Sequence, residues 1–262
     1  MTNVASSLQP GDFTGLAQNY ADFRPGYSRD LVKAFLALLP TELPQATLAD
    51  VGAGTGIFTK LLTTFGPSKL YAVEPNDDMR SFGAQTTAPF PVQWEKGSAE
   101  QTGLPTGSCD FLSMASSFHW ADTQVALDEF LRALKPGGVF VAIWNPRALE
   151  RNKLLKELED KLYVDFGLKK RVSSGASGIT AQLTDILNAH SGFRQTLYME
   201  AEEVTRMTKA RYMGIWRSVN DVRAQLGEKK FGEFLSICEK SLDTIPELDV
   251  TYRTRAWVAI KG

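Results

Sequence analysis

Three glycines at alternate positions, Gly52, Gly54 and Gly56, follow an apolar run at residues 47–51 and open a helical pattern at residues 56–64. Glycine allows a tight turn and a close approach of the backbone to a ligand, and N–H groups at a helix start can meet a polar or anionic group. The dinucleotide fingerprint requires another glycine where this chain has Ile57, and no P-loop lysine follows. The spacing therefore predicts a ligand-binding turn that differs from both motifs.

The acidic residue Glu74 ends the next predicted strand, residues 70–74. In nucleotide-binding α/β proteins, an acidic side chain about 20 residues beyond the glycine turn accepts hydrogen bonds from the ribose hydroxyls. Alone, such a residue is commonly a solvated cap. Combined with the glycine turn, it is predicted to bind a ribose.

The chain has two histidines, His119 and His190, and two cysteines, Cys109 and Cys238. A zinc site takes three or four ligands, and these residues show no ligand spacing, so we expect no metal. The two distant cysteines form no disulfide framework, which favours a reducing compartment. His119 follows a predicted strand closely and is a candidate general base; alternatively it only packs or hydrogen-bonds there. His190 lies in a polar stretch and is expected to be exposed.

The overall composition excludes several classes of protein. The 262 residues include 29 Lys and Arg against 30 Asp and Glu, a net charge of −1, which disfavours a nucleic-acid partner. A hydrophobic fraction of 43% with 23% charged residues is typical of a folded protein. No basic and apolar leader opens the chain, and no apolar run approaches the roughly 18 residues of a spanning helix. We therefore expect a cytoplasmic protein with no membrane partner.

The elements that position these residues alternate between short apolar runs and helical patterns, which is typical of a parallel α/β sheet with helices on both faces. The predicted strands are residues 47–51, 70–74, 92–96, 109–115 and 139–144. The predicted helices are residues 30–39, 56–64, 77–84 and 123–134.

The regular alternation of strands and helices ends after residue 144. An amphipathic helix is predicted at residues 150–166 and strands at 195–205 and 250–261, with helices at 209–225 and 229–242 inserted between them. We divide the chain into an N-terminal cap segment at 1–40, a Rossmann-like domain at 41–149, 193–205 and 248–262, and helical lid elements at 150–192 and 206–247.

Residues 50–56 and 73–75 resemble the first two motifs of class I S-adenosylmethionine-dependent methyltransferases. Residues 97–100, 104–105, 109–111 and 133–140 resemble that family's adenine edge, its fourth strand and its turn into the fifth strand. The resemblance covers about residues 15–145. It implies a Rossmann-like seven-stranded sheet, here with a helical lid between the last two strands. Segments 20–27 and 117–120 resemble the small-molecule subgroup of trans-aconitate and natural-product methyltransferases.

The resemblance implies S-adenosylmethionine as the cofactor and S-adenosylhomocysteine as its product. The N-terminal segment is expected to fold over the cofactor, with Tyr20 and Arg24 near the methionine carboxylate, although Tyr20 and Tyr27 can also be packing residues of a cap helix. The residues expected at the cofactor are Tyr20, Arg24, Asp50, Gly52, Ala53, Gly54, Thr55, Gly56, Phe58, Glu74, Pro75, Met79, Ser98, Ala99, Glu100, Ala115, Ser116 and Phe118.

Methyl transfer is an in-line displacement that requires positioning and an aromatic-lined, dry pocket. The residues expected at the methyl acceptor are Tyr27, His119, Trp120, Trp144, Asn145, Tyr212, Trp216, Arg217 and Asn220. For Trp144, and for Tyr212 and Trp216 on one helix face, packing in a core is the alternative. The acceptor is predicted to be a small secondary-metabolite heterocycle, phenol or carboxylic acid, methylated on nitrogen or oxygen.

Two alternatives remain for the function. The first is a Rossmann oxidoreductase that binds NAD, against which Ile57 and the lack of a Tyr-x-x-x-Lys pair count. The second is a catalytically silent S-adenosylmethionine-binding regulatory protein. The sequence does not exclude a protein as the methyl acceptor. The chain is predicted to be a monomer or a homodimer.

Overall fold

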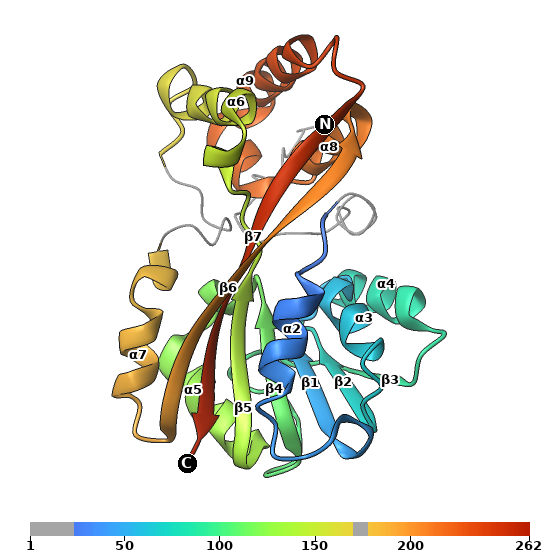
Figure 1. Ribbon diagram of the computed structural model, residues 1–262, viewed down its shortest axis with the longest axis vertical. Coiled ribbons are helices and arrows are strands. Elements are labelled where there is room, and N and C mark those ends of the chain that lie inside the picture. Colours follow the sequence, from blue (N-terminus) through green and yellow to red (C-terminus); the bar gives the residue numbers. More distant parts are fainter. Residues whose placement is uncertain (1–23, 170–177) are drawn as a thin grey trace, which may run out of the picture.

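The computed structural model describes residues 24–169 and 178–262. Within these residues, seven strands form one sheet in the order β3-β2-β1-β4-β5-β7-β6. Strands β1 to β5 run parallel, whereas β7 pairs antiparallel with both β5 and β6. This arrangement confirms the predicted seven-stranded α/β sheet (Figure 1).

The observed bounds agree closely with the predicted strands and helices of the sheet region, except that β5 begins at Leu134, ahead of the predicted start at residue 139. The strands are β1 Thr47–Val51, β2 Lys69–Val73, β3 Val92–Glu95, β4 Cys109–Ala115, β5 Leu134–Trp144, β6 Phe193–Thr208 and β7 Glu247–Lys261. The helices are α2 Arg29–Leu36, α3 Ile57–Thr63, α4 Asp77–Thr87, α5 Thr123–Ala133, α6 Lys153–Val164, α7 Leu183–Ala189, α8 Lys209–Arg217 and α9 Asn220–Ser241. None of these helices is long and apolar enough to cross a membrane.

Helices cover both faces of the sheet because successive strand residues point to opposite sides. On one face, Leu187 of α7 and Phe130 of α5 share a buried cluster with Phe140 of β5. On the other face, Phe35 of α2 stacks on Phe111 of β4 with ring centroids 5.7 Å apart. The two cores hold the strand ends in fixed positions, and the site lies at the ends of β1, β2, β4 and β5.

A third buried cluster lies away from the sheet, where β6 and β7 continue as a long two-stranded ribbon toward α6, α8 and α9 (Figure 1). In this cluster Trp216 of α8 packs edge-on against Phe234 of α9, with ring centroids 4.9 Å apart. Leu158 and Leu162 of α6 are buried in the same cluster. The helices inserted between the last two strands therefore have a core of their own.

Several details differ from the sequence predictions. Helix α7 was not predicted, and it lies within the segment 150–192 that we assigned to the lid; its Leu183 and Leu187 pack against the sheet instead. The first inserted helix, predicted at residues 209–225, is interrupted at Ser218, whose hydroxyl donates to the Ile215 carbonyl. A second break, at Gly227 where φ is 75°, falls between the two predicted helices and agrees with the prediction.

His190 is not exposed as expected. Its side chain is 10% exposed, and its Nε2 lies 3.2 Å from an Asp128 carboxylate oxygen. The ring also packs 5.5 Å from that of Phe193. The polar neighbours of His190 along the chain concealed a position that α5 and β6 enclose.

Candidate cofactor and acceptor site

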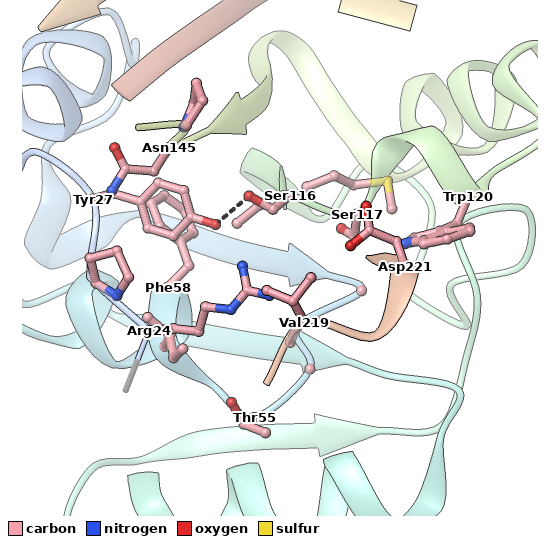
Figure 2. Close-up of a pocket in the computed structure, with 18 of the residues that line it drawn as sticks. Arg24, Tyr27, Thr55, Phe58, Ser116, Ser117, Trp120, Asn145, Val219 and Asp221 are labelled. Atoms are coloured by element: carbon pink, nitrogen blue, oxygen red, sulfur yellow. Dashed lines mark hydrogen bonds between the residues drawn. The ribbon is translucent and has the colours of Figure 1, made fainter. Parts of the chain in front are cut away.

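One cavity of about 590 Å³ opens where the sheet meets the lid, within the size range of small-molecule sites. Its wall combines the glycine turn, the ends of β2 and β4, the segment after β5, and residues of α6, α8 and β7. Figure 2 shows Arg24, Tyr27 and Phe58 on one side of this space and Trp120 and Asp221 on another. The cavity therefore lies between the sheet and the lid.

The glycine turn has the backbone conformation that its residue types predict. Gly52, Gly54 and Gly56 all have positive φ, at 65°, 58° and 82°. A Cβ at Gly52 would lie 2.7 Å from the Ser117 hydroxyl oxygen, whereas one at Gly54 would meet nothing within 4 Å. The backbone at Gly54 is thus open to the cavity. Gly56 does not line the cavity; it packs against Trp94.

Glu74 lies on the same wall, directly after β2, with 7% of its surface exposed. Its two carboxylate oxygens accept from the Gly54 N–H at 2.8 Å and the Asn76 N–H at 2.9 Å. Burial raises the pKa of Glu74, and these two N–H donors oppose that shift. The bonds fix the carboxylate at the turn while leaving each oxygen a further lone pair.

Asp50 does not reach the cavity, contrary to its expected place at the cofactor. It is fully buried, and it accepts from the hydroxyl groups of Thr59 at 2.6 Å and Ser113 at 3.1 Å. Burial raises its pKa to about 7. Asp50 thus connects β1 to α3 and β4 and supports the turn from beneath.

The residues expected around an adenine lie together beyond Glu74. Pro75, Met79, Ser98, Ala99 and Glu100 all line the cavity. The Glu100 carboxylate accepts from the Asp122 N–H at 2.8 Å, which ties this segment to the start of α5. The cavity therefore extends along the carboxyl ends of β2 and β3.

The end of β4 contains a strained residue. Ser116 has φ of 56°, the only positive value at a described non-glycine residue, and its N–H donates to the Ile143 carbonyl at 2.7 Å. The Ser116 and Tyr27 hydroxyl oxygens lie 2.9 Å apart in a hydrogen bond (Figure 2). Tyr27 also packs edge-on against Phe58. Strain of this kind concentrates at functional sites, and here it directs a hydroxyl into the cavity.

Two further predicted residues, Arg24 and Asn145, connect the segment before α2 to other parts of the wall. Arg24 Nε donates to the Ser218 hydroxyl at 3.3 Å, from the cavity wall to the lid. The Asn145 amide donates to the Gly26 carbonyl at 2.5 Å and accepts from Thr254 at 2.8 Å. The remaining predicted residues that line the cavity are Ala53, Thr55, Ala115 and Trp120.

His119 does not line the cavity. Its Nδ1 accepts from the Trp144 indole N–H at 3.4 Å, so the neutral ring carries its proton on Nε2, which is buried with no partner among the described residues. Burial lowers its pKa to about 4, partly opposed by Asp221. The ring is neutral at pH 7 and has no free lone pair directed at the cavity.

Four predicted aromatic residues pack in cores instead of the cavity wall. Phe118 and Trp144 belong to the sheet core, and Tyr212 and Trp216 belong to the lid core. Arg217 is half exposed and pairs with Glu239 at 2.5 Å. Large apolar side chains stabilise the fold most where they leave water completely, which explains why these positions are core.

Two predicted positions cannot be compared with the cavity. Tyr20 and the side chain of Asn220 lie outside the described residues.

Sequence reasoning missed the lid wall of the cavity. Residues there that we did not predict are Arg147, Leu149, Glu159, Asp160, Tyr163, Ile215, Val219, Asp221 and Tyr252. Arg147 stands three residues after β5, close enough to the sheet edge to have been a candidate. The others lie on helices and a ribbon whose inward face depends on how the lid packs.

Comparison with known proteins agrees with this architecture. Residues 49–142 match the family model described as a methyltransferase domain. An uncharacterized methyltransferase of Mycobacterium tuberculosis is 34% identical over 143 residues, 53% of this chain and 54% of that protein. The biotin biosynthesis bifunctional protein of Cellvibrio japonicus is 29% identical over 154 residues, 58% of this chain and 30% of that protein. The chain thus spans about half or less of the length of these relatives.

Solved structures show the same fold. A provisionally assigned type II methyltransferase from Anaeromyxobacter dehalogenans has a TM-score of 0.66 and 22% identity, covering 91% of this chain and 98% of that one. Phosphoethanolamine N-methyltransferase 2 of Haemonchus contortus, in complex with phosphomonomethylethanolamine and S-adenosylhomocysteine, has a TM-score of 0.52 and 17% identity, covering 95% of this chain and 57% of that one. The chain has the class I methyltransferase fold. Residues 49–142 of this fold are the part that matches the methyltransferase domain model.

Proposed function

We propose that this protein transfers a methyl group from S-adenosylmethionine to a small-molecule acceptor. The observation that carries the proposal is the contact between the Gly54 N–H and the Glu74 carboxylate on one cavity wall. This contact holds the Glu74 carboxylate beside an open glycine backbone, and in nucleotide-binding α/β proteins a carboxylate at this position accepts ribose hydroxyls. The methyltransferase domain match over residues 49–142 supports the same function.

The residues of the cavity fit this cofactor. Glu74 accepts the two ribose hydroxyls, and Ser98, Ala99 and Met79 surround the adenine. The Thr55 hydroxyl is buried at the turn with no partner among the described residues, so it has a hydrogen bond to give to a ligand. The sulfonium, when bound, supplies an electrophilic methyl group.

The acceptor binds on the lid side of the same cavity. Ser116 and Asn145 follow the carboxyl ends of β4 and β5, and Tyr27, which precedes α2, hydrogen-bonds to Ser116; all three line the cavity. They hold the acceptor atom in line with the methyl group, and positioning of this kind contributes much of the rate. The lid wall, through Ile215 and Val219, excludes water from the reaction.

Methyl transfer to a panel of carboxylic acids, phenols and heterocycles, measured with isotope-labelled S-adenosylmethionine, tests this function. Labelled product from one class is the expected result. Binding of S-adenosylhomocysteine without transfer to any member would instead favour a catalytically silent binding protein.

A further inference from the structure

The lid end of the cavity contains a buried polar pair that the inferred cofactor site does not use. Arg147 and Tyr252 lie directly opposite each other in an antiparallel bridge. Two backbone bonds of 2.8 Å flank the bridge, from Arg253 N to Pro146 O and from Ala148 N to Thr251 O. Opposed residues of an antiparallel pair present their side chains on the same face, and both residues line the cavity. The pair is therefore held rigidly at the wall.

The hydrogen bonding of this pair is incomplete. Arg147 Nη2 donates to Glu159 at 2.8 Å, but Arg147 Nη1 is buried without an acceptor among the described residues. The Tyr252 hydroxyl is likewise buried without a partner there, and the residue is 4% exposed. A buried donor left without an acceptor is destabilising. Two of them at one cavity wall indicate a ligand that supplies the acceptors.

The guanidinium of Arg147 is fixed in place by its surroundings. It stacks over the Trp216 ring at 4.4 Å from the centroid and lies 5.9 Å from that of Tyr212. With Glu159 on one edge and two aromatic rings against it, Arg147 can offer only its remaining edge to a ligand. A donor fixed in this way loses little conformational entropy on binding.

The charges around the pair favour an anion. Burial raises the pKa of Tyr252, while the guanidinium groups of Arg147, Arg24 and Arg211 all act to lower it. Glu159 neutralises one of these three cations. Two other carboxylates, Asp160 and Asp221, also line the cavity, and Asp221 acts on His119 behind the wall. The charged groups that act on the Tyr252 hydroxyl itself are the three arginines.

We propose that Arg147 Nη1 and the Tyr252 hydroxyl bind a carboxylate of the methyl acceptor, one donor to each oxygen. The inference rests on the proposed function, because it assigns the lid side of the cavity to the acceptor. The carboxylate anchors the acceptor, and the apolar side chains of Leu149, Ile215 and Val219 contact its hydrocarbon part. The acceptor is therefore a carboxylic acid with an apolar body.

Calorimetry on the protein saturated with S-adenosylhomocysteine tests this subsite, with phenylacetate, cinnamate and hexanoate as probes and their primary amides as matched ligands. At least one acid is expected to bind about tenfold or more tightly than its amide, which lacks the charge-assisted bonds. If no acid binds more tightly than its amide, the subsite does not exist.

Variants locate the effect. Tyr252→Phe keeps the ring and is expected to weaken the preferred acid about tenfold while changing its amide little. Tyr198→Phe, at an exposed tyrosine of β6 outside the cavity, is the matched control and should change neither. Arg147→Gln combined with Glu159→Gln removes both charges without leaving a buried carboxylate unpaired, and should abolish the preference for the acid. An acid affinity that survives both Tyr252→Phe and the double variant would overturn the assignment.

The affinity for S-adenosylhomocysteine, measured first in the same titrations, separates this inference from the proposed function. The wild-type protein and Tyr252→Phe should bind it equally. If the wild-type protein does not bind it, the proposed function fails; if it binds but shows no preference for acids, only the carboxylate subsite fails.

Discussion

Replacement of Glu74 by alanine should weaken S-adenosylhomocysteine binding at least tenfold. The carboxylate lies at the cavity wall with only 7% of its surface exposed, so water replaces its lost hydrogen bonds poorly. Hydrogen bonds to charged groups contribute about 1.5–3 kcal/mol each. Loss of two such bonds to the ribose hydroxyls, partly offset by water in the vacated space, is worth roughly 2–4 kcal/mol, and each 1.4 kcal/mol is about tenfold in affinity.

Two companion variants make this experiment specific. Glu74→Gln keeps one carbonyl oxygen and should fall between the wild type and Glu74→Ala. Glu95→Ala removes an exposed carboxylate from the end of β3 and should bind as the wild type does.

The pH dependence gives a second readout. Because burial raises the pKa of Glu74, the carboxylate form that accepts from the ribose is lost as the pH falls through that raised value. Wild-type affinity should therefore fall toward acidic pH, and the affinity of Glu74→Gln should not follow it. Unchanged affinity in Glu74→Ala, measured by calorimetry, would refute the ribose role.

Three further predictions concern the turn, the buried carboxylate and the histidine. Both Gly52→Ala and Gly54→Ala should lose cofactor affinity, and Gly54→Ala should lose about 1–2 kcal/mol of stability because its φ is positive. Gly52→Ala should unfold at a lower temperature than Gly54→Ala, because its Cβ would also lie 2.7 Å from a hydroxyl oxygen; equal melting temperatures for both would contradict this. The folded-state pKa of Asp50 is about 7 against 3.8 for an unperturbed carboxyl, so stability decreases as the pH rises between these values. The melting temperature of Asp50→Asn minus that of the wild type should accordingly be larger at pH 8 than at pH 5. A difference that does not change with pH would rule out this ionisation. His119→Asn should lower turnover, followed as S-adenosylhomocysteine release, by less than about tenfold, since the ring does not line the cavity; a loss of about 10²–10⁴ would restore the general base.

The sheet could be predicted from the sequence because its signals are local. The apolar run before Gly52 and the acidic Glu74 after the next strand have a spacing that few other folds produce. Strands β1 and β4 even begin and end at the predicted residues. The position of Ser98 and Ala99 in the cavity wall could be predicted too, since both follow β3 closely at the same edge of the sheet.

The lid side of the cavity could not be predicted in the same way. Tyr212 and Trp216 share one face of α8, but periodicity does not distinguish a face directed at a ligand from a face directed at a core. Both side chains are fully buried in the lid. Arg147 and Tyr252 are 105 residues apart, and only the pairing of β7 beyond β5 brings them together.

The Trp144–His119 contact is a further example of long-range packing that sequence spacing does not reveal. His119 stands four residues after the end of β4, where a base would be useful, yet the indole of Trp144 occupies its Nδ1 lone pair. The position along the chain was informative, but the direction of the ring depended on the core behind it.

The proposed function depends most on which ligand the glycine turn and Glu74 bind. Isothermal titration of the wild-type protein with S-adenosylhomocysteine, and in parallel with NAD, tests it directly. We predict saturable binding of S-adenosylhomocysteine with one site per chain and no binding of NAD. Absence of heat with S-adenosylhomocysteine, or tight binding of NAD in its place, would contradict the assignment of the glycine turn and Glu74.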